Sequence, residues 1–193
     1  MKKINFETEL RFLVKGTEWK KLGRGTEIWQ GFISTHHKRV VRVRIFGEAA
    51  FLTIKGQKVG DDNPEFEWPI SKEEAIEMFQ TPNLMEGFSI RKVRYKIPFA
   101  SADPWIELTW EVDEFLEENE SLRIAEIELT GISNEEEKKE LKQSILGNLP
   151  TWIGKRLDFQ SDPDAARYFN NELAKRPFAH WNEEEKADMM SHH

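Results

Sequence analysis

Pairs of like-charged residues that stand two positions apart recur along the first 130 residues of the chain. Because side chains at i and i+2 of a β-strand point to one face, each pair would present two charges of one sign together. Lysine and arginine clusters suit phosphate oxygens, whereas carboxylate clusters suit hard divalent cations. These residues therefore predict a site for a polyanion and a metal ion. The basic residues are Arg11, Arg42, Arg44, Lys55, Lys92 and Arg94, and the acidic residues are Glu7, Glu9, Glu65, Glu67, Glu111, Asp113, Glu126 and Glu128.

β-Strands must carry these residues, because apolar and polar side chains alternate with a period of two through the same region. The apolar side of the alternation includes Trp68 and Trp110, which we expect in the core beneath helices. Eight strands are predicted, which is enough to close a barrel around one small ligand. They cover residues 5–14, 26–34, 39–46, 49–57, 63–70, 88–98, 104–115 and 123–130.

Helical patterns occupy two short breaks between the strands and the C-terminal third of the chain. Ser71 and Glu74 match a capping box, which is typical of a helix start. A turn is predicted at Pro150–Gly154, and the acidic tail is expected to fray. The predicted helices lie near 17–22, near 72–80, from a cap at residue 133 or 134 through Ile145, and from about 162 to 174.

The charged face of the strands has two interpretations. A sheet with one face in water is the commoner arrangement. It would, however, set like charges opposite each other on neighbouring strands, which is destabilising, and solvent-facing sheets usually mix signs. In a closed eight-stranded antiparallel barrel, both clusters would lie inside and find ligands, with the apolar faces outward beneath the helices. We favour the barrel. The segregated charges support the binding of a ligand more strongly than they support catalysis.

Composition limits the class of protein. With 193 residues, 38% of them hydrophobic and 33% charged, we expect one soluble domain over 1–193, with strands in 1–130 and helices of 131–193 packed on them. The absence of cysteine excludes disulfides and thiolate metal sites. A net charge of -7 argues against nucleic-acid and membrane partners. No signal peptide or membrane span is recognisable, so a cytoplasmic location is expected.

Seven short motifs follow one another in a fixed order, and together they resemble the strands of the CYTH (triphosphate tunnel) family. No single motif is specific, but the ordered set covers nearly the whole chain. Segments 150–154 and 167–174 also resemble the C-terminal part of the short bacterial inorganic triphosphatases of that family. The seven motifs are Glu7-Thr8-Glu9-Leu10-Arg11, Arg42-Val43-Arg44, Thr53-Ile54-Lys55, Glu65-Phe66-Glu67, Lys92-Val93-Arg94-Tyr95, Glu111-Val112-Asp113 and Glu126-Ile127-Glu128.

The resemblance implies an eight-stranded antiparallel tunnel in which a metal-associated water attacks the terminal phosphorus of a triphosphate, with Mg²⁺ or Mn²⁺ as the cofactor. It implies Glu9, Lys92 and Arg94 as catalytic residues. The implied triphosphate ligands are Arg11, Arg42, Arg44, Lys55, Lys92 and Arg94. The implied metal ligands are Glu7, Glu9, Asp113, Glu126 and Glu128. Glu65, Glu67 and Glu111 would orient bases or serve a second metal.

Two residues depart from the family pattern: Arg11 replaces a lysine, and Phe32 replaces a common tyrosine. Arginine keeps the charge of lysine in a planar fork, whereas phenylalanine lacks the hydroxyl of tyrosine. The substrate therefore stays open between inorganic tripolyphosphate, which we favour, thiamine triphosphate and nucleoside triphosphates. A class IV adenylate cyclase is a further alternative.

A non-catalytic polyphosphate-binding module is the alternative of another class. The eight acids argue against it, because a pure anion binder gains nothing from interior carboxylates. The predicted partner is a small-molecule triphosphate, and the oligomeric state, including a homodimer, is left open.

Overall fold

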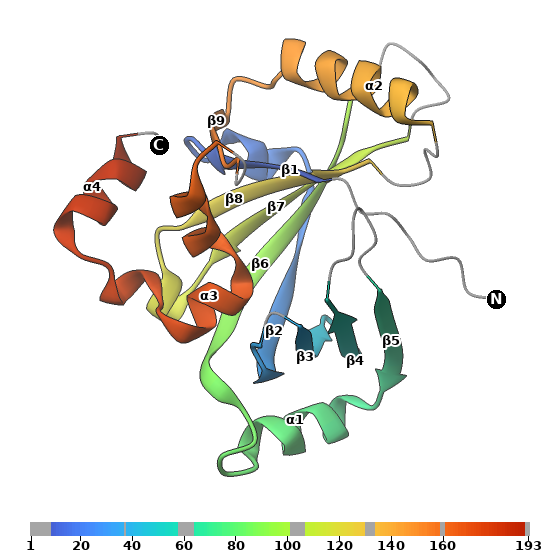
Figure 1. Ribbon diagram of the computed structural model, residues 1–193, viewed down its shortest axis with the longest axis vertical. Coiled ribbons are helices and arrows are strands. Elements are labelled where there is room, and N and C mark those ends of the chain that lie inside the picture. The colour runs from blue at the N-terminus through green and yellow to red at the C-terminus, as the bar shows by residue number, and fades with distance from the viewer. Residues whose placement is uncertain are drawn as a thin grey trace.

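In the computed structural model, nine β-strands of the described residues pair antiparallel in one sheet, in the order β5-β4-β3-β2-β6-β7-β8-β1-β9 (Figure 1). The structure describes residues 9–36, 38–57, 64–100, 107–129, 134–158 and 161–191. The period-2 alternation predicted eight of these strands. The bounds are β1 (Glu9–Val14), β2 (Arg24–Ser34), β3 (Arg39–Phe46), β4 (Ala49–Gly56), β5 (Glu65–Ile70), β6 (Glu86–Pro98), β7 (Thr109–Phe115), β8 (Arg123–Glu128) and β9 (Ile153–Arg156).

The expectation of a closed eight-stranded barrel is wrong: the sheet is curved but open, with β5 and β9 at its edges. The turn predicted at 150–154 is present, with Ile153 N–H donating to Pro150 O at 3.0 Å, and the ninth strand, β9, begins at its end. This strand pairs with β1 through Phe12 and Arg156. Two flanking backbone bonds, Lys15 N–H to Trp152 O and Leu157 N–H to Arg11 O, extend this pairing. Because β9 takes the free edge of β1, the backbone groups there are not available to β5. Within the described ranges no ladder joins the two sides of the sheet.

Four α-helices and four short 3₁₀ helices accompany the sheet in the described parts of the chain. The helix predicted near 72–80 is confirmed with its capping box, in which Ser71 Oγ accepts from Glu74 N–H and Glu74 accepts from Ser71 N–H. No helix in the described part of the chain has the length and apolar character that crossing a membrane requires. The α-helices are α1 (Lys72–Gln80), α2 (Glu135–Gly147), α3 (Asn170–Lys175) and α4 (Glu183–Met190), and the 3₁₀ helices are η1 (Glu18–Lys21), η2 (Glu117–Asn119), η3 (Pro163–Tyr168) and η4 (Phe178–His180).

The C-terminal region is more ordered than expected. The helix predicted at 162–174 is divided into η3 and α3, because Phe169 between them has an extended backbone (φ −70°, ψ 142°). The acidic tail, expected to fray, forms α4. Asn182 and Glu185 make a capping box at its start, and Arg176 ties Glu185 to the preceding segment through two bonds of 2.8 and 2.5 Å.

The convex face of the sheet carries apolar residues beneath α1 and α2, as the alternation predicted. Trp110 is 1% exposed and packs edge-on against Phe12 and Trp152. Trp68, also expected in the core, is 47% exposed. The reason is its place on edge strand β5, because α1 packs over β3 and β4 instead.

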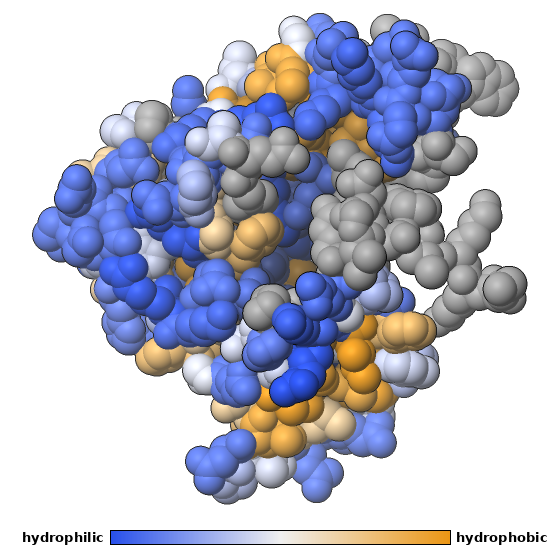
Figure 2. All heavy atoms as spheres, viewed as in Figure 1, coloured by the Kyte–Doolittle hydropathy of each residue, from blue (hydrophilic) through white to orange (hydrophobic). Residues whose placement is uncertain are grey.

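The concave face changes from apolar to charged along its length. On β1, Leu13 stands two residues from Arg11, and on β6, Ile90 stands two residues from Lys92. The apolar end packs on the C-terminal segment, with α3 against the concave face, whereas α1, α2 and η1 pack on the convex face. On the side of the molecule shown in Figure 2, hydrophobic residues gather around α1 on a face that is otherwise mostly hydrophilic. The strand residues of this layer are Leu13, Phe32, Ile90, Phe115 and Ile124, and the C-terminal ones are Leu157, Ala165, Tyr168, Leu173, Ala174, Trp181 and Met189.

Candidate active site

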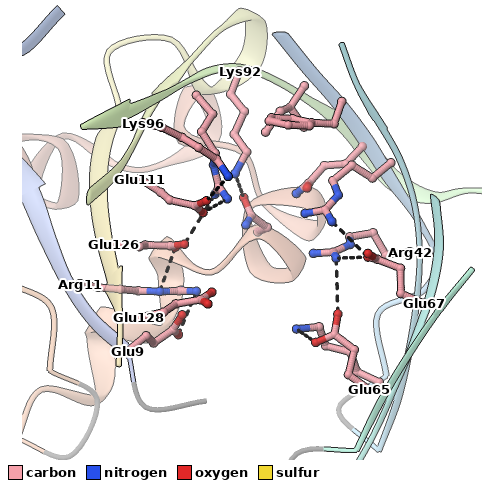
Figure 3. A pocket seen from close by; sticks show the side chains of 17 residues that line it. Glu9, Arg11, Arg42, Glu65, Glu67, Lys92, Lys96, Glu111, Glu126 and Glu128 are labelled. Atoms are coloured by element: carbon pink, nitrogen blue, oxygen red, sulfur yellow. Dashed lines mark hydrogen bonds and ion pairs between the residues drawn. The ribbon is translucent and has the colours of Figure 1, made fainter. Parts of the chain in front are cut away.

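A charged cavity of about 540 Å³ occupies the other end of the concave face (Figure 3). It gathers all the predicted site residues except two. Glu7 lies outside the described residues, and Asp113 is buried behind the cavity wall. The lining residues are Glu9, Arg11, Ile28, Gln30, Arg42, Arg44, Phe46, Lys55, Glu65, Glu67, Lys92, Arg94, Lys96, Glu111, Glu126, Glu128 and Asn170.

Asp113 holds the two cations at the base of the cavity. It stands opposite Arg94 in the β6–β7 ladder, and its Oδ1 and Oδ2 accept from Arg94 Nε and Nη2, each at 2.7 Å. Lys92 Nζ donates to the same carboxylate, and both side chains are 1% exposed. Arg94 also donates to Glu111. The Asp113 carboxylate, expected among the metal ligands, is engaged here in orienting two bases.

The pKa values of this trio follow from burial and from close charges. Burial is the largest influence on Lys92 and lowers its pKa to about 8, although Asp113 opposes the shift. Burial alone would raise the pKa of Asp113, but Arg94 and Lys92 outweigh it and lower this pKa to about 2. For Arg94, Asp113 and Glu126 outweigh burial and raise the pKa. Asp113 and Arg94 therefore stay charged as an ion pair, whereas Lys92 loses its proton more easily than Arg94 does.

A second basic group lines the opposite wall, on β3 and β4, beside the acids of β5. Arg44 Nη2 donates to Glu67 Oε2 at 3.1 Å, and Lys55 Nζ lies 2.9 Å from Glu65. Thr53 is fully buried between them and donates to Glu67 at 2.8 Å. The acids of β5 therefore fix the direction of the bases on β3 and β4.

The arginines of this wall each have a hydrogen-bond donor that is not used by the described residues. In the described part of the chain, the buried Nε atoms of Arg42 and Arg44 have no hydrogen-bond acceptor. Burial, followed by the charge of Arg44, lowers the pKa of Arg42 to about 10. Buried donors without acceptors and cations that repel each other are both relieved by an anion. This wall fits a ligand with several anionic oxygens.

The acidic wall is formed by β1, β7 and β8. Glu9 faces Glu128 in the ladder, and Glu126 faces both Arg11 and Glu111. Arg11 lies among these acids, with its Nη2 3.1 Å from Glu9 and its Nε 3.0 Å from Glu126. Figure 3 shows Glu9, Arg11, Glu126 and Glu128 stacked on one side of the cavity, across from Arg42 and Glu67.

A divalent cation fits this wall by the chemistry of its donors, because hard cations take several carboxylate oxygens. Among the residues that the structure describes, however, no three carboxylates converge as they would around one ion. Arg11 supplies positive charge between two of them. Carboxylates directly opposite each other on neighbouring strands repel, so the wall gains stability from added positive charge.

Five lining residues were not among the predicted site residues: Ile28, Gln30, Phe46, Lys96 and Asn170. Lys96 lies on the same face of β6 as Lys92 and Arg94, so the alternation in the sequence could have identified it. Its side chain is 58% exposed, and its Nζ lies 3.3 Å from Glu111. Phe46 lies beneath it, 5.9 Å from Lys96 Nζ. Asn170 and Gln30 carry no charge, so the like-charge pattern could not reveal them. Asn170 comes from α3 and accepts from Lys92 at 3.5 Å.

Comparisons with known proteins agree with this fold. The family model described as the CYTH domain matches residues 5–150. An inorganic triphosphatase from Acetivibrio thermocellus is 38% identical over 177 residues, covering 92% of this chain and 98% of that protein.

Solved structures below 25% identity share the fold. A crystal structure of an inorganic triphosphatase superposes with a TM-score of 0.55 at 23% identity, over 87% of this chain and 93% of that one. A protein from Pyrococcus horikoshii OT3 gives 0.53 at 20% identity, over 76% and 93% of the two chains.

Proposed function

This chain belongs to the CYTH domain family, and from that premise we propose that it hydrolyses a triphosphate, inorganic tripolyphosphate foremost, to pyrophosphate and phosphate. The observation that carries the proposal is the division of one cavity into a basic side and an acidic side. The inorganic triphosphatase from A. thermocellus, 38% identical over nearly its full length, supports this substrate class.

The basic side chains are proposed to bind the phosphoryl oxygens. Arg42 and Arg44 approach from β3, and Lys92 and Arg94 approach from β6. Residues two apart on a strand are separated by about 7 Å, so each pair reaches beyond a single phosphoryl group. Lys55 and Arg11 add charge from β4 and β1. A clamp of this length favours a triphosphate over pyrophosphate.

The acidic side is proposed to hold the metal, with Mg²⁺ or Mn²⁺ as the ion and Glu9, Glu126, Glu128 and Glu7 as its ligands. A divalent ion supplies Lewis-acid stabilisation of phosphoryl charge when it is bound. We assign Asp113 instead to the orientation of Lys92 and Arg94, because both of its oxygens are already engaged with them. Glu65, Glu67 and Glu111 have the same orienting role toward Lys55, Arg44 and Arg94.

Catalysis would rest on cationic side chains that are already in position where negative charge develops during the reaction. In phosphoryl transfer, negative charge spreads over the transferring group and the leaving oxygen. Lys92 and Arg94 are held rigidly by Asp113, so their reorganisation during the reaction is small. One water is consumed, the bond from the terminal phosphorus to its bridging oxygen breaks, and pyrophosphate leaves. Glu9 lies at the wall of the cavity with 28% of its side chain exposed. We propose that it accepts a hydrogen bond from that water.

One assay tests the proposal. Phosphate release is measured from tripolyphosphate, pyrophosphate, ATP and thiamine triphosphate, with magnesium, with manganese and with EDTA. We expect rapid metal-dependent release from tripolyphosphate and little from pyrophosphate. Equal rates on pyrophosphate, or full activity in EDTA, would contradict it. Tight binding without turnover would favour the polyphosphate-binding module.

A further inference from the structure

Gln30 lines the cavity from the central strand β2 with an uncharged polar side chain. The side chain is 1% exposed, and its Nε2 has no hydrogen-bond acceptor among the residues that the structure describes. In the ladders Gln30 faces Arg44 on β3 and Ile90 on β6. Its amide therefore stands between the two basic groups of the cavity, on the strand that contributes no charge to the lining.

An amide without an acceptor at this place is costly to the free protein. Buried donors are almost always paired, and leaving one unpaired costs about 1–3 kcal/mol. A leucine or methionine would fill the same volume without that cost. The energetic balance changes if the acceptor arrives with a ligand. The last torsion of a glutamine side chain is soft, so the NH₂ group can turn toward the cavity without moving the strand.

The acceptor that suits this position is a phosphoryl oxygen. Arg44 on one side and Lys92 on the other attract an anion to the space in front of the amide. A neutral donor adds a directed hydrogen bond there without adding to the repulsion between the neighbouring cations.

We propose that Gln30 is a substrate-binding residue whose amide donates a hydrogen bond to an oxygen of the bound triphosphate, held without an acceptor until the substrate arrives. The inference rests on the proposed function and adds to it a recognition residue that carries no charge. It predicts that the free protein and the substrate complex respond in opposite directions to loss of the amide.

The test compares Gln30→Met with the wild type and with a matched control, Gln80→Met, on the exposed end of α1. Thermal unfolding is measured for each protein alone and with tripolyphosphate plus magnesium, and steady-state kinetics with tripolyphosphate are recorded. For Gln30→Met we expect a melting temperature without ligand equal to or above that of the wild type. The ligand-induced rise should shrink, and kcat/KM should fall about tenfold, mostly through KM. Gln80→Met should match the wild type in every measurement.

A second variant keeps the test decisive if Gln30→Met does not fold. Gln30→Glu preserves the shape and can pair with Arg44, but it presents a negative acceptor to the substrate, so its loss of kcat/KM should exceed tenfold. Two results overturn the inference. One is a lower ligand-free stability of Gln30→Met with an unchanged ligand-induced rise, which marks a structural amide. The other is wild-type kinetics in both variants. Failure of the wild type itself to release phosphate would instead refute the proposed function.

Discussion

Asp113 and Arg94 face each other across the β6–β7 ladder and share two hydrogen bonds of 2.7 Å, which makes a bidentate ion pair at the base of the cavity. The same carboxylate accepts from Lys92. Bidentate arginine–carboxylate pairs fix the plane of the guanidinium as well as its position. Arg94 thus presents its remaining donors in one direction, toward the cavity.

Removing the charge of Asp113 should weaken both the fold and the site. Asp113→Asn leaves Lys92 and Arg94 buried with less compensating charge, and such losses at buried ion pairs cost about 3 kcal/mol or more. Urea unfolding without ligand measures this cost. Asp164→Asn, which removes one partner of an exposed pair with Arg167, is the control and should change stability by less than about 1 kcal/mol. Equal stability of the two variants would show that the buried trio contributes nothing.

The pH profile should reveal the low pKa of Lys92, about 8 instead of the ordinary 10.5. The cationic form binds phosphate, so kcat/KM for tripolyphosphate should decline as the pH rises above about 8. Asp113→Asn, which removes the main influence raising this pKa, should move the decline to lower pH. Lys92→Arg should move it upward, because arginine stays protonated. A decline at one pH in all three proteins would assign it to another group.

The same pKa has a consequence for stability with a definite sign. Between about pH 8 and 10.5 the unfolded chain keeps a proton on Lys92 that the folded protein has lost. The unfolded state then binds more protons, so this residue makes stability rise with pH across that window. Lys92→Met should reduce the slope of unfolding free energy against pH in the same window. An unchanged slope would contradict the lowered pKa.

The acidic wall should determine the metal requirement. Glu126→Gln keeps the shape of the side chain but removes one carboxylate from the proposed metal ligands. We expect the magnesium concentration for half-maximal activity to rise and turnover at saturation to fall at least a hundredfold. Glu118→Gln, on the exposed η2 turn, is the matched control. Magnesium titrations of the three proteins provide the measurement, and coincident curves would remove Glu126 from the metal site.

Arg11 points into the cavity and pairs with Glu9 and Glu126, as its parity on β1 required. We expect Arg11→Lys to change KM for tripolyphosphate by less than about tenfold, or roughly 1.4 kcal/mol. Arg11→Ala should cost more, above all at low magnesium, because the acids then lose a compensating charge and repel the substrate. Kinetics across a magnesium titration separate the two variants. Wild-type behaviour of Arg11→Ala at every concentration would exclude Arg11 from the site.

The sequence alone determined the strands and which side of each carries charge. That information is local, because a period of two assigns every second residue to one face whatever the neighbouring strands are. It placed Arg42 and Arg44 on one side of β3 and Trp110 on the covered side of β7. It also located the capping box at Ser71, whose signal lies within four residues.

Only the tertiary structure decided which edges stay free, where the C-terminal segment packs, and which charges neutralise each other. The four residues of β9 show no alternation, yet they take the edge of β1 and leave the sheet open. Trp68 has the pattern of a core residue, but no described helix covers its edge strand. Asp113 differs most from what its pattern indicated, and the unpaired amide of Gln30 had no signal in the charge pattern. Charge and period specify the face of a strand, whereas the partner across the ladder depends on contacts between segments far apart in the chain.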